Sequence, residues 1–124
     1  MIDIIAMVMP KIRLNPLPMA AFHILLSLAD EDLHGYEIMR RVEAHTDGRM
    51  RMGPGTLYSS VQALLEAGFI SEVAPRGSVD VADGRRRYYR LTAAGRSAAR
   101  DEAERLAGTL RLARARKILR GGHV

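Results

Sequence analysis

The sequence predicts a mainly α-helical domain with one small β-hairpin, followed by a long C-terminal helix. Apolar residues recur at three-to-four-residue spacing in three segments between residues 17 and 68. The period then changes to alternation on either side of the turn-forming residues 77–84, and residues 93–119 contain no proline. A chain of 124 residues is long enough for one domain with a modest core.

Residues 1–16 form an apolar arm. We expect the arm to pack on its own domain or on a partner subunit, because so much exposed apolar surface is unfavourable. It opens with Asp3 in place of a basic segment, and Pro10 interrupts its apolar run, whereas roughly 20 residues are needed to span a bilayer. We therefore expect no export signal and no membrane anchor. The absence of cysteine excludes disulfides and thiolate chemistry and suits a cytoplasmic protein.

A first helix is expected within residues 18–30, after Pro16 and Pro18. His23 lies beside its apolar face and is expected to be a partly buried structural histidine. The chain breaks at the acidic residues 30–32. The apolar face consists of Leu17, Ala21, Ile24, Leu25 and Leu28.

Two further helices follow, joined by an arginine-containing turn. The second opens at Gly35 and closes at residues 46–48. The third begins at Gly53-Pro54-Gly55, where proline costs no hydrogen bond because the first N–H groups of a helix have no intrahelical partner. Gly68 is well placed to stop this helix. Its buried face is expected to contain Leu57, Val61, Leu64 and Leu65.

A hairpin with a long tip is expected next, with strands over residues 69–73 and 85–91. In the second strand, pleating places Tyr89 and Leu91 on the core side and Arg86, Tyr88 and Arg90 on the other side. The order of three helices and a hairpin is that of a winged helix-turn-helix, here expected over residues 17–91.

The third helix is the candidate recognition helix of this fold, whose first residues would reach the major groove of DNA. Once the inward-facing residues are set aside, small and polar residues remain near its start. Small residues let the backbone approach DNA, hydroxyl and free N–H groups bind phosphate, and a glutamine can read a base edge. The candidate contacts are Gly55, Thr56, Ser59, Ser60 and Gln62.

The hairpin adds a basic wing in which arginines alternate with tyrosines. Arg85 and Arg87 lie nearest the tip, where they could bend towards phosphate or a minor groove, and Arg86 lies on the exposed side. The whole chain is basic, with a net charge of +5 and a sequence pI of about 10.2. Double-stranded DNA is therefore the expected partner.

The C-terminal helix is expected over residues 92–120, capped by Thr92 and followed by a short tail, residues 121–124. Its apolar residues step by four, three, four and three, which is a narrow seam typical of a helix that pairs with another helix. The same helix of a second chain is the simplest partner, and packing on its own domain is the alternative. The seam consists of Ala99, Ala103, Leu106, Leu110 and Ala113.

Three segments of the chain resemble the PadR family of repressors in order and spacing. They are HGYEIMRRVE (34–43), GPGTLYSSVQALLEAGFI (53–70) and GRRRYYRLTAAGR (84–96). The resemblance covers roughly residues 17–120 and places the chain in the short branch of the family, with a single terminal helix. It departs from the family at Ser59, where a proline often follows GTLY.

The resemblance implies a homodimer that pairs through its C-terminal helices and binds a near-palindromic operator as a repressor. By residue match, Tyr36, Thr56, Tyr58 and the wing arginines fall where family members approach DNA. Family members often respond to small phenolic or lipophilic compounds, so an effector of that kind is a further expected partner.

Other classes of function have less support in the sequence. The four histidines show no metal-ligand spacing, Gly53-Pro54-Gly55 lacks the lysine of a phosphate-binding loop, and no nucleophile has a nearby base. We therefore expect neither an enzyme nor a cofactor or metal. A winged helix that binds protein or RNA without specific DNA readout stays the alternative.

Overall fold

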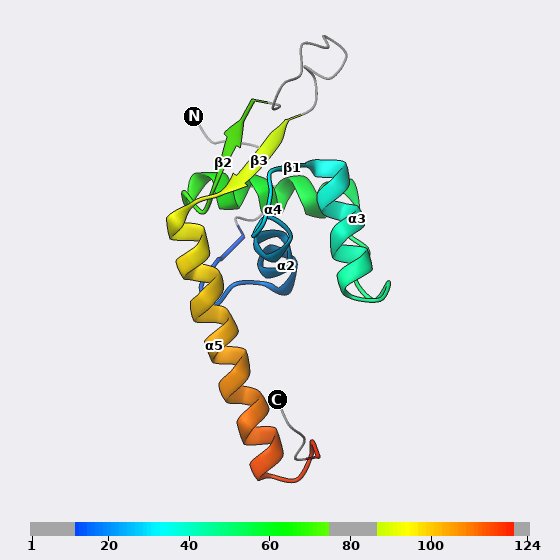
Figure 1. Ribbon diagram of the computed structural model, residues 1–124, viewed down its shortest axis with the longest axis vertical. Helices are drawn as coiled ribbons and strands as arrows, with labels where there is room; N and C mark the ends of the chain where they lie inside the picture. Colours follow the sequence, from blue (N-terminus) through cyan, green and yellow to red (C-terminus); the bar gives the residue numbers. More distant parts are fainter. Residues whose placement is uncertain (1–11, 75–86, 121–124) are drawn as a thin grey trace, which may run out of the picture.

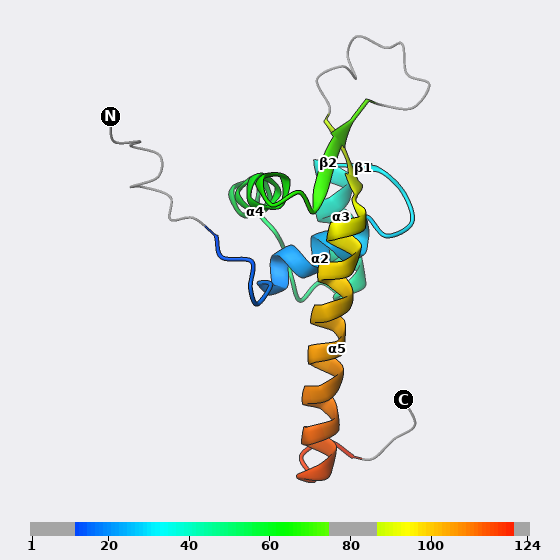
Figure 2. The same ribbon diagram turned by 90° about the vertical axis from the view of Figure 1, so that its left-hand side faces the viewer.

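The computed structural model describes residues 12–74 and 87–120, and it has the predicted fold class (Figure 1). Three helices, α2 (Met19–Ser27), α3 (Gly35–His45) and α4 (Pro54–Glu66), form the body of the domain. A small sheet lies at one end of this body, and the long helix α5 (Ala93–Ala115) extends away from it at the other (Figures 1 and 2). Among the described residues, no helix combines the length and the apolar character needed to cross a membrane.

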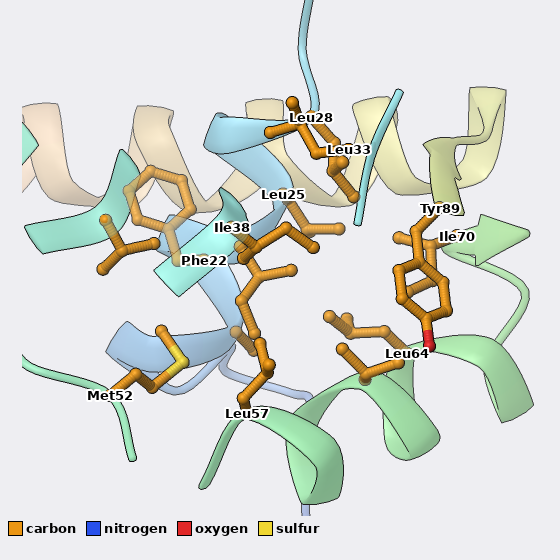
Figure 3. Close-up of a cluster of buried hydrophobic side chains, with 14 of the residues drawn as sticks. Phe22, Leu25, Leu28, Leu33, Ile38, Met52, Leu57, Leu64, Ile70 and Tyr89 are labelled. Atoms are coloured by element: carbon orange, nitrogen blue, oxygen red, sulfur yellow. The ribbon is translucent and has the colours of Figure 1, made fainter. Parts of the chain in front are cut away.

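The hydrophobic core lies around α2, which contacts α3, α4 and α5. Ile24 and Leu25 of α2 are completely buried. Figure 3 shows Leu25 in one cluster with Ile38 of α3 and with Leu57 and Leu64 of α4. All five residues of the apolar face predicted for the first helix belong to this core, so the helical periodicity identified it correctly.

Helix α4 begins and ends where its sequence requires. Gly53 is its N-cap and Pro54 its first residue. At its end Gly68 takes a left-handed conformation with φ of 77°, which lets the Gly68 N–H bond to the Leu65 carbonyl and the Phe69 N–H to the Leu64 carbonyl (3.1 and 2.9 Å). This pair of bonds satisfies the last carbonyl groups of the helix and turns the chain into the sheet.

The sheet has three antiparallel strands in the order β1-β3-β2. The predicted hairpin is present as β2 (Ile70–Val73) and β3 (Tyr88–Leu91), with Ile70 opposite Leu91. The third strand, β1 (Leu33–His34), pairs with the other edge of β3 and was not predicted. A two-residue strand is too short to show an alternating pattern. The wing tip, residues 75–86, lies outside the described residues.

The start of α5 is attached to the junction between α4 and β2. The Thr92 hydroxyl accepts a bond from the Gly95 N–H (3.0 Å) and donates one to the Gly68 carbonyl (2.6 Å), while the Thr92 N–H bonds to the Phe69 carbonyl (3.1 Å). The predicted cap is therefore confirmed. Gly95 is buried here, and a Cβ atom at this position would lie only 1.9 Å from the Phe69 carbonyl oxygen.

Helix α5 ends at Ala115, earlier than the expected residue 120. Lys117 takes a left-handed conformation (φ 61°), and the Ile118 N–H bonds back to the Ala113 carbonyl at 2.9 Å. This is the same closing arrangement as at the end of α4, here formed without a glycine, so nothing in the residue types marked the stop.

The two ends of the chain are only partly described. Residues 1–11 of the predicted arm and the tail 121–124 lie outside the described residues. Of the remaining arm, Leu14 packs against the core.

Candidate nucleic-acid interface

The start of α4 is exposed and has no competing anion. Gly53 supplies no side-chain cap, and the first turn contains no acidic residue. The free N–H groups and the positive end of the helix dipole therefore remain available to a phosphate group. Gly55 and Thr56 are exposed at this end, and apart from the helix's own backbone no described atom lies within 4 Å of a Cβ placed on Gly55. A phosphodiester backbone could approach α4 closely at this point.

Further along α4, three of the predicted contact residues differ in how far they are exposed. Tyr58 and Gln62 are exposed, and the Gln62 amide donates to the Glu66 carboxylate at 3.2 Å. Ser59 is half-buried, and its hydroxyl donates to the Gly55 carbonyl at 2.8 Å. These three side chains lie on the outer part of the helix.

The expectation that Ser60 faces outward is wrong. Only 3% of Ser60 is exposed, because it lies three residues after Leu57 and four before Leu64 and so belongs to the buried face of α4. Its polar side chain concealed a position that the spacing alone assigns to the core.

A groove of about 440 Å³ runs between the start of α3, the outer face of α4 and strand β3. Two tyrosines line it and remain largely exposed: 62% for Tyr36 and 58% for Tyr58. The helices approach closely at Gly35, where a Cβ atom would lie 3.1 Å from Leu57 Cδ2. Gln62 and Arg87 complete the polar lining, so the groove brings together residues from all three predicted segments.

The start of α3 is held by His34, a residue that sequence analysis missed. The His34 Nδ1 atom accepts a bond from the Glu37 N–H at 3.2 Å and caps the helix. The His34 ring also stacks on Tyr36 (centroids 6.4 Å apart) and meets the ring of Tyr88 edge-on (5.4 Å). Its position directly before the helix-opening glycine was the available signal.

Arg40 lies next to the same exposed tyrosine. Its guanidinium carbon is 5.9 Å from the centre of the Tyr36 ring, and its Nη1 atom is 3.6 Å from the Glu37 carboxylate. Its side chain remains 64% exposed. A cation over the ring face favours this direction of the tyrosine and adds positive charge beside a residue that lines the groove.

The wing arginines have different surroundings. Arg85 and Arg86 lie outside the described residues. The side chain of Arg87 is 70% exposed and 3.7 Å from the Glu72 carboxylate, which leaves it able to reach a ligand. Arg90 forms two bonds with the Asp32 carboxylate (3.1 and 2.8 Å), so its role is to attach β3 to the loop before β1. Tyr89, expected on the core side, is buried.

The predicted seam on α5 divides into two parts. Ala99 and Leu106 are half-buried and pack against the core of their own domain. Ala103 and Leu110 are exposed, with Leu110 exposed by 45%, and Ala113 is half-buried. The end of α5 extends away from the body in both views (Figures 1 and 2). Among the described residues, the helix thus packs on its own domain as far as Leu106 and is exposed at Leu110 beyond it.

The residues described do not suggest metal chemistry. Within residues 12–74 and 87–120, no group of three or more histidine or acidic side chains is arranged to hold a metal ion. His23 is half-buried beside the core, as predicted for a structural histidine. Burial lowers its pKa, and the nearby His45 lowers it further.

Fold and surface together define a winged helix-turn-helix transcriptional regulator, and comparison with known proteins identifies the family. Residues 24–101 match the Transcriptional regulator PadR-like family. The chain belongs to this family, as its three sequence segments predicted, and it is a regulator and not an enzyme.

Known relatives agree with this assignment. The chain is 37% identical over 86 residues to Transcriptional regulator Rv3488 of Mycobacterium tuberculosis, covering 68% of this chain and 72% of the relative. A transcriptional regulator from Clostridium thermocellum has a similar structure, with a TM-score of 0.64 and 28% identity over 75% of this chain and 84% of that one. Bacillus subtilis PadR, solved in complex with operator DNA, shares the fold at a TM-score of 0.56 and 20% identity, over 67% of this chain and 45% of its own.

Proposed function

We propose that this protein is a sequence-specific DNA-binding repressor that acts as a homodimer on a near-palindromic operator in the cytoplasm. The observation that carries the proposal is the groove, where Tyr36, Tyr58, Gln62 and Arg87 are exposed together beside the uncapped start of α4. Bacillus subtilis PadR, which shares the fold, was solved with operator DNA bound.

The residues of the groove suggest a division of roles on DNA. Gly55 and Thr56 at the free start of α4 are suited to phosphate, and Gln62, once released from Glu66, is suited to a base edge. Tyr36 and Tyr58 are suited to sugar and phosphate contacts on either side. The wing arginines, Arg85, Arg86 and Arg87, supply positive charge to the flanking backbone.

The exposed end of α5 supports the proposed dimer. Leu106 and Leu110 lie on one side of the helix, with Leu106 only half-buried against its own domain and Leu110 45% exposed, and pairing with a second copy would remove the rest of this apolar seam from water. Changing both to glutamate should abolish dimers in sedimentation and operator binding with them. Leu112→Glu is the matched control, because Leu112 is 55% exposed and lies about 200° around the helix from Leu110. Dimers that survive the double substitution would contradict this arrangement.

A small phenolic or lipophilic effector is a further part of the proposal. A cavity of about 340 Å³ lies between residues 14–17 and α5. Its apolar lining includes Leu14, Leu17 and Phe69, and its charged lining consists of Asp101 and the hydrogen-bonded pair Glu102–Arg105. Such a cavity fits a ligand with an apolar body and one polar group. An effector bound there would touch the helix that we expect to hold the dimer together.

Genomic selection tests the DNA-binding function. Fragments captured by the purified protein would be sequenced, and the most enriched fragment titrated at two salt concentrations. We expect a two-fold symmetric site bound far more tightly than random DNA. Weak and uniform binding, or a preference for RNA over duplex DNA, would favour the interaction-module alternative and contradict the proposal.

Two arginines of the same strand provide a sharper test. Arg87→Gln should remove one phosphate contact from each protomer and flatten the slope of log K against log salt by about 1.8 for the dimer. Arg90→Gln removes the same charge from a residue already bound to Asp32, so the slope should stay the same. Equal effects of the two changes would show that the phosphate contact is not made by Arg87 in particular, and would contradict this assignment.

A further inference from the structure

The net charge of the chain is concentrated at the far end of α5. Residues 106–120 contain five cationic residues and no aspartate or glutamate, and the whole chain has a net charge of +5. The remaining residues, which include the winged-helix body, therefore have a combined net charge of zero. The five cations are Arg111, Arg114, Arg116, Lys117 and Arg120.

These cations are available to a ligand. Four of the five are exposed, and the fifth, Arg114, is half-buried. Its Nε atom is buried and has no hydrogen-bond partner among the described residues. Every ion pair found within residues 12–74 and 87–120 uses a cation at or before Arg105. No carboxylate in the described part of the chain therefore neutralises this end.

The basic end lies far from the proposed DNA groove. A helix of 23 residues is roughly 35 Å long, and its first turn is bonded to the junction between α4 and β2. In both views the end of α5 is at the opposite end of the molecule from strands β2 and β3 (Figures 1 and 2). A duplex held against α4 and the wing would not reach it.

The arrangement of the side chains favours a polyanion over an anionic membrane. Successive residues of a helix are about 100° apart, so Leu110 and Leu112 lie on nearly opposite sides. The large apolar residues of this part of α5 are therefore divided between the narrow Leu106–Leu110 seam and Leu112, and they do not form the one wide apolar face that an interfacial helix needs. Arg111 and Arg116 flank the Leu106–Leu110 seam on opposite sides, so pairing through that seam would leave both free. Guanidinium groups pointing in several directions suit the phosphates of a nucleic acid.

We propose that residues 106–120 form a second, sequence-independent DNA contact, which binds the phosphate backbone of a duplex other than the one in the groove. The proposed contact is electrostatic. It depends on the proposed function only in requiring that the groove also binds DNA. A dimer would present two such ends and could hold two duplexes together. With about four phosphate contacts, its affinity should fall about 150-fold between 50 and 200 mM salt.

A two-duplex capture assay tests this contact. The full-length protein would be bound to an immobilised duplex, and retention of a second, fluorescent duplex of unrelated sequence measured over a salt series. Arg116→Gln combined with Arg120→Gln should weaken retention at least tenfold and flatten its salt slope by about 1.8 for two contacts. Both residues follow Ala115, the last residue of α5, so the helix should persist.

The matched control removes the same charge elsewhere. Arg13→Gln with Arg100→Gln changes two exposed cations outside the segment and should leave retention within twofold. The proposal is overturned if the test and control variants behave alike, if the unaltered protein retains no second duplex, or if anionic vesicles bind the segment more tightly than DNA. Equal loss of affinity for the immobilised duplex would also overturn it, since both contacts would then be on one duplex. Failure of operator specificity would leave the capture result unaffected, so the two proposals are tested separately.

Discussion

Replacing Gly95 by alanine would place a methyl group against the backbone of the α4–β2 junction. A Cβ atom there would lie 1.9 Å from the Phe69 carbonyl oxygen and 2.8 Å from Leu91 Cδ1. Backbone cannot rotate away as a side chain can, so the first turn of α5 would have to move by roughly 1.5 Å to restore an ordinary contact distance.

That movement would break the attachment of Thr92. Its bonds to the Gly68 and Phe69 carbonyls are worth about 1 kcal/mol each, and its cap on Gly95 about another 1 kcal/mol. Alanine gains about 1 kcal/mol over glycine within a helix, which offsets part of the loss. We expect the free energy of unfolding to fall by about 2 kcal/mol, a large share of the 5–15 kcal/mol typical of a domain.

Urea unfolding followed by circular dichroism would measure this change at one fixed protein concentration. Gly108→Ala is the matched control in the same helix, because its Cβ atom would meet only the flexible end of Arg111, at 3.4 Å. There we expect a gain of about 0.5–1 kcal/mol. The reasoning from backbone contact would be refuted if both substitutions changed the free energy of unfolding in the same direction, or if the Gly95→Ala protein were as stable as the original.

Three other substitutions test the surrounding structure. Burial holds the pKa of His23 below its ordinary value of 6.5, so the stability that the neutral ring confers is complete above that pH and is lost as the pH falls towards the lower, folded pKa. Urea titrations from pH 7.5 to 5 should show this loss, and His23→Gln should flatten it. Thr46→Val removes the hydroxyl that accepts the Met50 N–H at 3.0 Å, and it should cost about 1–2 kcal/mol and speed exchange of that amide proton; unchanged exchange would show that water replaces the hydroxyl. Arg90→Lys cannot form both bonds to Asp32, and hydrogen exchange should become faster in β1 while the helices of the body are unaffected; equal acceleration everywhere would mean general destabilisation.

The fold could be predicted because residues close to each helix end determine where that helix begins or ends. The glycine and proline at the start of α4, Gly68 at its end and Thr92 at the start of α5 each act within a few residues of their own position. Ser60 is the instructive failure, since its spacing from Leu57 indicated burial and its polarity indicated exposure. In a helix with a strong apolar face, position outweighs residue type.

The features that could not be predicted depend on residues distant in the chain. Strand β1 exists because Leu33 and His34 meet the edge of β3, more than fifty residues later. The pair between Asp32 and Arg90 has the same origin, and it separates Arg90 from the other wing arginines. Local sequence carries no signal for such pairings, since either partner alone is an ordinary exposed charge.

The position of His34 limits how this protein could release DNA. The residue belongs to β1, caps α3 and contacts Tyr88 of β3, so the wing and the start of α3 are joined through a single side chain and its backbone. The wing and the helix then keep a fixed spacing and cannot be withdrawn from DNA one at a time. If the proposed dimer responds to an effector, we expect that effector to change the distance between two intact domains, so that neither fits its half of the proposed operator.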